Sequence, residues 1–86
     1  MADISVIFFA HLRETLGKAE CSVELSELNT QDTVGLISYL TETLAGFQDY
    51  TESQAVLVAV NQTLVNSNTP IASGDEVALF PPVTGG

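Results

Sequence analysis

The feature that most constrains the fold is one long stretch of helical periodicity, residues 30–46, which stands among shorter stretches that alternate. Apolar residues recur in it at the spacing of one helix face: Leu36, Ile37, Leu40 and Leu44. Helix-capping residue types precede them, namely Thr30, Asp32 and Thr33, and Gly46 stands where a helix would end. Gly35, in the first turns, costs about 1 kcal/mol relative to alanine. The stretch predicts one main helix, whose apolar stripe must be buried against another layer.

The segments before this helix predict two strands and a short helix. Residues 3–10, "DISVIFFA", alternate and become apolar on both faces, which favours an interior strand. Leu12 and Leu16 are then one helical turn apart, and Gly17 is placed as a helix C-cap. In residues 21–27, "CSVELSE", alternation returns with one polar face, which indicates a strand exposed on one side.

After the main helix the pattern predicts a hairpin and a last strand. Residues 55–60 and 63–65 are strand-like and are joined by a tight turn at Asn61 and Gln62. Residues 76–80, "EVALF", alternate again, and the prolines that follow cannot donate to a sheet. We therefore expect an α+β fold in two layers, a mixed sheet packed on one main helix. This order resembles the β-grasp fold of ubiquitin-like proteins. We expect residues 1–80 to form the domain and residues 81–86 a flexible C-terminal tail.

Composition narrows the classes of function. The sequence has eleven acidic residues and only two basic ones, Arg13 and Lys18, which gives a formal net charge of −9. Nucleic acid and anionic membranes are therefore not expected ligands. The acidity serves solubility, steering toward a basic partner, or both. With Cys21 alone, no internal disulfide or cysteine-ligated cluster can form within the chain. There is no basic leader and no apolar run of about 20 residues, so we expect a cytoplasmic protein.

The interior of the sequence lacks a recognisable catalytic or metal motif. His11 and Cys21 are the only imidazole and the only thiol, and no sequence signature joins them. We expect His11 to be exposed on the short helix without a role, and Cys21 to be buried as a small hydrophobic residue. No metal-ligand spacing and no phosphate-binding loop is present.

The C-terminal segment "FPPVTGG", residues 80–86, is the strongest functional feature. Pro81 and Pro82 favour an extended chain, and six residues reach on the order of 20 Å. Gly85 and Gly86 add no side-chain bulk, so a narrow cleft could surround their backbone. A carboxylate there would need activation, for instance as an acyl adenylate, before it could donate an acyl group. The alternative is that the two glycines are only a frayed end.

Three segments carry a resemblance to a known family. They are "VIFFAHLRETLG" near the start, "AVNQTLV" at 59–65 and "SGDEVALFPPVTGG" at 73–86. Together they resemble the small subunits of molybdopterin synthase, while residues 18–55 match in pattern only. The resemblance implies a β-grasp sulfur carrier, a sulfurtransferase subunit without catalytic residues of its own apart from the C-terminal thiocarboxylate.

The resemblance also implies a reaction and its partners. The Gly86 carboxylate would be adenylated by an E1-like enzyme using ATP and converted to a thiocarboxylate with sulfur from a donor protein. The tail would then enter the large catalytic subunit, within a heterotetramer, and deliver sulfur to cyclic pyranopterin monophosphate to form the molybdopterin dithiolene. No cofactor and no metal would be bound by this chain itself.

The resemblance assigns roles to individual residues. Gly86 would carry the sulfur, and Gly85 would share the reactive tail with it. The residues expected to contact partners are Phe8, Arg13, Leu64, Phe80, Pro81, Pro82, Val83 and Thr84. For the phenylalanines the alternative is packing in the core, which is less expected for Phe80 because its strand face is opposite that of Val77 and Leu79.

Two other functions remain open at this stage. The first is a β-grasp carrier for thiamine synthesis or tRNA thiolation, or a modifier conjugated to lysines. The second is a passive acidic interaction domain in which the tail has no role.

Overall fold

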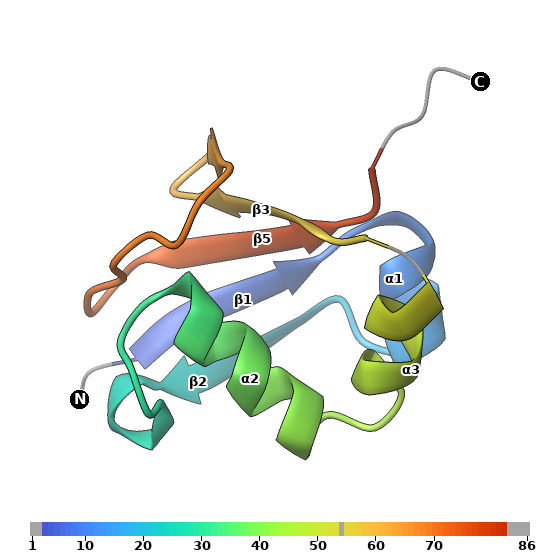
Figure 1. Cartoon of the computed structure of the whole chain (residues 1–86), viewed down its shortest axis with the longest axis horizontal. Helices are drawn as coiled ribbons and strands as arrows, with labels where there is room; N and C mark the ends of the chain where they lie inside the picture. Colours follow the sequence, from blue (N-terminus) through green and yellow to red (C-terminus); the bar gives the residue numbers. More distant parts are fainter. Residues whose placement is uncertain (1–2, 54, 83–86) are drawn as a thin grey trace.

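The computed structural model describes residues 3–53 and 55–82. Five strands form one sheet, and helices pack against it (Figure 1). The strands are β1 (Asp3–Phe8), β2 (Glu20–Glu24), β3 (Leu57–Val60), β4 (Thr63–Val65) and β5 (Glu76–Phe80). The helices are α1 (Ala10–Leu16), α2 (Thr33–Thr43) and α3 (Phe47–Ser53), with a 3-10 turn at Leu25–Glu27.

The sheet is mixed, with strand order β2-β1-β5-β3-β4. Its first and last strands, β1 and β5, lie side by side and parallel, while the other neighbours are antiparallel. A parallel pair needs a long crossover, and here it includes α2 and the β3–β4 hairpin. This is the α+β, β-grasp arrangement that the sequence predicts.

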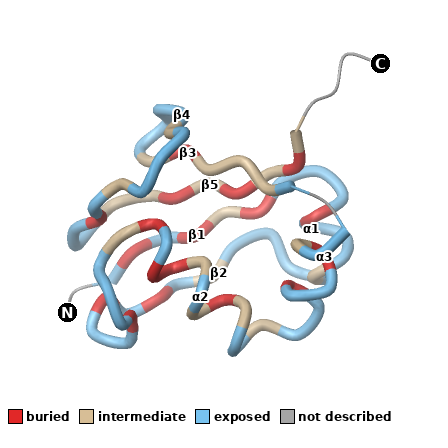
Figure 2. The backbone as a smooth tube through the Cα atoms, viewed as in Figure 1, coloured by how far each residue is buried: buried red, intermediate tan, exposed pale blue. Residues whose placement is uncertain are grey.

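The core lies between the sheet and the helices (Figure 2). Alternate strand residues enter it, including Ile4, Val6 and Phe8 of β1 and Val77 and Leu79 of β5. Helices contribute buried residues from the other layer: Leu12, Leu36, Leu40, Phe47 and Tyr50. The helices therefore cover one face of the sheet, and the opposite face, here called the open face, has no helix over it among the described residues.

The start of α2 is set by Asp32, one of three predicted capping residues. Its carboxylate accepts hydrogen bonds from the Gly35 amide and the Thr30 hydroxyl, each at 2.8 Å. These donors lower the pKa of Asp32, the Gly35 amide having the larger effect. The helix then runs from Thr33 to Thr43, within the predicted limits.

The short helix α1 is confirmed, with Gly17 in the left-handed conformation at its C-cap. The second strand is shorter than predicted because the chain turns into a 3-10 helix after Glu24, although Leu25 is still buried. Helix α3 is not predicted by the sequence analysis. Only Phe47 and Tyr50 are buried on it, one turn apart, which is too short a pattern to show a helical period.

The hairpin and the last strand are confirmed. Asn61 and Gln62 both have positive φ, 51° and 70°, as a type I′ turn between β3 and β4 requires. The Asn61 side chain also fastens the turn to the start of β5: its amide nitrogen donates to the Asp75 carboxylate and its oxygen accepts from the Glu76 amide, each at 3.0 Å. No helix in residues 3–53 and 55–82 is long and apolar enough to cross a membrane.

Gly35 is explained by a close approach rather than by backbone conformation. A Cβ atom at this position would overlap the carbonyl oxygen of Thr30, in the segment that leads into the helix. A backbone atom cannot move aside as easily as a side chain can. Glycine is therefore needed at this position, despite its low helix propensity, because only glycine lets the preceding loop pack against the first turn of α2.

We expect Gly35→Ala to lower the free energy of unfolding by about 2 kcal/mol or more, because strain from the overlap outweighs alanine's better helix propensity. Denaturant unfolding of the variant measures this. Ser38→Ala, at an exposed position of the same helix, is the matched control and should change stability by less than about 0.5 kcal/mol. A stabilised Gly35→Ala variant would contradict the steric explanation.

We expect Gln62→Gly to raise the free energy of unfolding by about 0.5–1 kcal/mol, since glycine adopts positive φ without steric cost. Asn61→Gly should do the opposite despite a similar φ, because it removes both hydrogen bonds to the start of β5. The pair is compared by thermal and denaturant unfolding. Equal effects of the two substitutions would show that the side-chain bonds of Asn61 contribute nothing.

Candidate functional site

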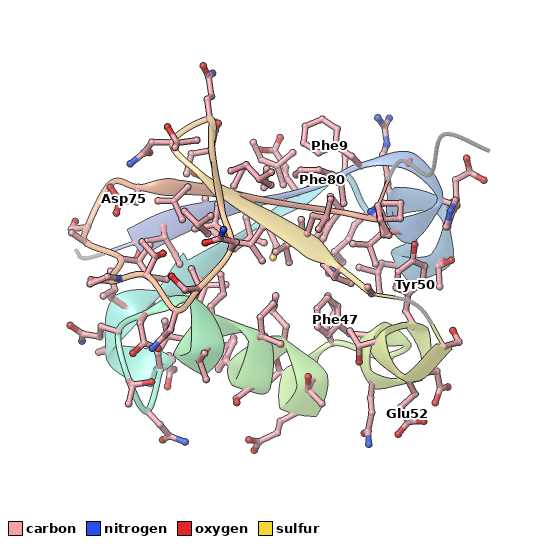
Figure 3. All side chains as sticks on the ribbon, turned by 45° about the horizontal axis from the view of Figure 1, so that its top comes forward. Phe9, Phe47, Tyr50, Glu52, Asp75 and Phe80 are labelled. Atoms are coloured by element: carbon pink, nitrogen blue, oxygen red, sulfur yellow. The ribbon has the colours of Figure 1, made fainter. Side chains whose placement is uncertain are left out.

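The parallel pairing of β1 and β5 brings the ends of both strands to one edge of the sheet. Phe8 is opposite Leu79 in the ladder, and the Phe9 amide donates to the Leu79 carbonyl at 3.1 Å, which continues the pairing past the end of β1. Phe9 and Phe80 therefore lie side by side where the two strands end (Figure 3). The chain beyond Phe80 continues from this point.

Phe9 and Phe80 form an aromatic pair on the open face (Figure 3). Their ring centroids are 6.4 Å apart and the ring planes make an angle of 82°, an edge-to-face arrangement. Phe9 is 46% exposed and Phe80 is half-buried. The pair therefore presents an apolar surface at the point where the chain leaves the sheet.

The expectation that Phe8 contacts a partner is wrong for the described structure. Phe8 is 1% exposed and lies in the core with Ile4 and Val6, so it offers no surface. Side chains alternate along a strand, which puts Phe9 on the opposite side from these three. The same alternation could have identified Phe9 from the sequence, because Ile4, Val6 and Phe8 already share one face.

The apolar surface extends across the open face. Leu57 is opposite Phe80 and Leu64 is opposite Ala59 in the ladders, so these side chains project to the same side of the sheet. Leu64 is 60% exposed. We define Phe9, Leu57, Leu64 and Phe80 as the docking face. Leu64 and Phe80 belong to the residues predicted to contact partners.

A hollow of about 520 Å³ lies beside the aromatic pair, at the root of the tail. Its lining residues come from the end of β1, the start of α1 and the end of β5: Phe9, Ala10, His11, Phe80, Pro81 and Pro82. Pro81 is buried and Pro82 half-buried, so Pro81 anchors the chain against the domain, and the contacts of both prolines with a partner stay predictions. The arrangement can hold the root of a segment that extends to another molecule.

The other predicted site residues have different outcomes. Arg13 is exposed on α1. Val83, Thr84, Gly85 and Gly86 lie outside the described residues, so their roles and the boundary between domain and tail at residue 80 stay predictions.

His11 is exposed, as expected, and it makes a contact that the sequence does not suggest. Its Nδ1 is 2.9 Å from the hydroxyl oxygen of Tyr50, and the two rings are 5.7 Å apart. Tyr50 lies on the side of α3 that faces the sheet, away from Glu52 (Figure 3), and is 6% exposed. Burial raises the pKa of its hydroxyl, which therefore keeps its proton at neutral pH.

The thiol of Cys21 is not arranged for chemistry. Cys21 is opposite Val6 in the β1–β2 ladder, is half-buried and packs against the core. Burial raises the pKa of the thiol, an effect that Lys18 partly offsets. A raised pKa reduces the nucleophilic thiolate fraction. Among the described residues, no three His, Cys, Asp or Glu side chains are grouped so that they could hold a metal ion.

Comparison with known proteins adds to this geometry. A sequence model of the ThiS family matches residues 6–86. The molybdopterin synthase sulfur carrier subunit of Escherichia coli is 40% identical over 87 residues, covering 96% of this chain and 99% of that protein. The protein of the same name from Mycobacterium tuberculosis is 31% identical, with both chains fully covered.

A solved structure supports the fold. The crystal structure of SAMP1 from Haloferax volcanii superposes with a TM-score of 0.75 at 24% identity, covering 98% of this chain and 99% of that one. At this identity the likeness concerns the fold alone.

Stability measurements should separate the two neighbouring phenylalanines. We expect Phe8→Ala to lower the free energy of unfolding by about 3–5 kcal/mol because it empties a core position. Phe9→Ala, on the exposed side, should cost less than about 1 kcal/mol. Denaturant unfolding of both variants tests this, and a larger loss for Phe9→Ala would reverse the assignment of core and surface.

Proposed function

This chain belongs to the ThiS family, and on that premise we propose that it is the sulfur carrier subunit of a molybdopterin synthase in molybdenum cofactor biosynthesis. The observation that carries the proposal is the docking face at the root of the Gly-Gly tail. Phe9 and Phe80 present apolar surface where the chain leaves the sheet, so binding there would aim the tail at the bound protein. The names of the curated relatives support the same function.

In this proposal the reacting group is the Gly86 carboxylate. The carboxylate attacks the α-phosphate of ATP on an E1-like adenylating enzyme, and pyrophosphate leaves. Sulfur at the oxidation level of sulfide, supplied by a donor protein, then forms a bond to the carbonyl carbon as AMP leaves. The thiocarboxylate sulfur then forms a bond to a carbon of cyclic pyranopterin monophosphate and displaces an oxygen substituent there, and water cleaves the acyl–sulfur bond and restores the carboxylate. Two such transfers supply the two sulfur atoms of the molybdopterin dithiolene.

The folded domain has a different task, which is to bind and orient. Burial of apolar surface contributes about 25 cal/mol per Å², so the docking face can supply binding free energy without engaging the tail itself. Pro81 is buried and Pro82 half-buried, so the root of the tail is held against the domain. The partner would supply the catalytic groups.

Two kinds of partner use the same tail in turn. One is the adenylating enzyme, which brings ATP, and the other is the large catalytic subunit, with which this chain would assemble as a heterotetramer. The net charge of −9 would speed encounter with basic surfaces and make the encounter sensitive to salt. Arg13, exposed on α1, would pair with a carboxylate of a partner.

The only cysteine supports the assignment of sulfur to the tail. Cys21 is half-buried against the core and its pKa is raised, so it is poorly suited to carry exchangeable sulfur. A thiocarboxylate at Gly86 needs no cysteine from this chain. A carrier for another thiolation pathway, or a protein modifier, would use the same terminus and differs only in its acceptor.

We expect ATP, the adenylating enzyme and a sulfur donor to increase the intact mass of the protein by about 16 Da, as one oxygen is replaced by sulfur. Intact and fragment mass spectra locate the change, which should be at Gly86. A variant lacking Gly85 and Gly86 is the control: it should fold as the parent does and show no mass change.

Complementation then distinguishes the acceptors. Rescue of a strain that lacks the molybdopterin synthase small subunit supports the proposal. Failure there, with rescue of a thiamine or tRNA thiolation defect, would assign the carrier to another pathway. If the truncated variant performs as well as the parent in every strain, the chain is a passive interaction domain.

A further inference from the structure

The hydrogen bond between His11 and Tyr50 joins an exposed residue of α1, close to the point where the tail begins, to a residue of the interior. His11 lines the hollow beside Phe80 and Pro82, whereas Tyr50 is almost wholly buried on α3. The bond links α1 to α3 across 39 positions of sequence. Neither residue has a role in the proposed sulfur chemistry, yet together they occupy the edge from which the tail leaves.

The position of the protons in this bond follows from the hydrogen-bond partners of the Tyr50 hydroxyl. The Tyr50 hydroxyl has one proton to donate, and the hydrogen bond that the described structure gives it leads to His11 Nδ1. If Nδ1 carried a proton instead, that proton would point at the hydroxyl oxygen, and the hydroxyl proton would have no acceptor among the hydrogen bonds of the described residues. The favourable arrangement has Tyr50 donating to an unprotonated Nδ1.

This arrangement determines what His11 shows to solvent. A neutral imidazole carries one proton, so with Nδ1 accepting, Nε2 carries it. The two ring nitrogens point in different directions, so Nε2 points away from the Tyr50 hydroxyl, and His11 as a whole is exposed. The N–H donor that His11 offers to another molecule at the rim of the hollow is therefore Nε2–H.

The backbone beside His11 is also held in an unusual conformation. Ala10, between Phe9 and His11, has φ of 55°, a left-handed conformation that non-glycine residues adopt only at a cost of about 1–3 kcal/mol. This turn takes the chain from the end of β1 into α1, so that Phe9 and His11 both line the hollow. Such conformations persist where the surrounding structure holds them, and they cluster at functional sites.

We propose that His11 is a positioning residue beside the docking face. Its Nε2–H, oriented by Tyr50, donates a hydrogen bond to an uncharged oxygen acceptor of the protein that receives the tail. The inference about the partner rests on the proposed function. A backbone carbonyl fits better than a carboxylate, since a protein of net charge −9 attracts basic surfaces and repels acidic ones. The bond would fix the direction in which the tail root enters the cleft.

The first test concerns the free protein and needs no partner. Nitrogen-15 NMR of the imidazole ring at pH about 8 reports the tautomer of His11. We expect the Nε2–H form in the parent and a mixture of both forms in Tyr50→Phe, which keeps the buried ring and removes the hydroxyl. A parent protein with the Nδ1–H form would overturn the inference.

The second test measures affinity for the large subunit of molybdopterin synthase from the same organism. We expect His11→Ala to weaken binding about fivefold to tenfold, the size of one net hydrogen bond. His11→Gln, which restores an N–H donor, should stay within about threefold of the parent. The affinity of Tyr50→Phe should lie between those of the parent and of His11→Ala, because this variant keeps the Nε2–H donor but lacks the hydroxyl that orients it.

Phe80→Ala is the reference that separates this inference from the proposed function. If Phe80→Ala weakens binding and His11→Ala does not, the docking face stands and the role of His11 is overturned. If neither substitution changes the affinity, the docking face is wrong and the His11 contact falls with it. Equal weakening by His11→Ala and His11→Gln would also overturn it, because ring packing rather than donation would then explain the loss.

Discussion

The pairing of the first strand with the last is the constraint on which the rest of the structure depends. β1 and β5 are parallel neighbours in the middle of the sheet, although 67 residues lie between Phe8 and Glu76. Parallel strands end at the same edge, so the residues that follow each strand meet there. This single pairing places Phe9, Phe80 and the root of the tail together.

The two faces of the sheet then take different tasks. The helix-covered face holds the core, with side chains such as Val6, Leu36 and Val77 excluded from solvent. The open face keeps apolar side chains partly exposed near the tail. These side chains contribute less to the stability of the domain than they would if they were buried. Buried side chains of β1, β2, β5 and the three helices form one core cluster, and this core stabilises the domain while the patch stays exposed.

In the proposed function, the residues that support the tail rigidly and the terminus that reacts are separate parts of the chain. Pro81 is buried beside the aromatic pair, and His11 is tied to Tyr50 on α3, so several elements hold the point from which the tail departs. Catalytic side chains are not required of such a carrier, because the chemistry proposed for it takes place in the clefts of its partners. Its specificity would lie in the docking face and in the direction that the face gives to the tail.

The sequence by itself determined the order of the strands, the main helix with a cap among Thr30, Asp32 and Thr33, the Asn61–Gln62 turn and the acidic charge, because periodicity and turn chemistry are local properties. Its family resemblance also indicated the tail chemistry and the apolar contacts at Leu64 and Phe80. Tertiary structure alone decided that Phe9 packs beside Phe80 at the root of the tail, that Phe47 and Tyr50 form a short helix, and that Tyr50 reaches His11. The reason is physical: these features depend on which distant segments pack together, and two apolar residues in a seven-residue helix carry too little local pattern to reveal their partners.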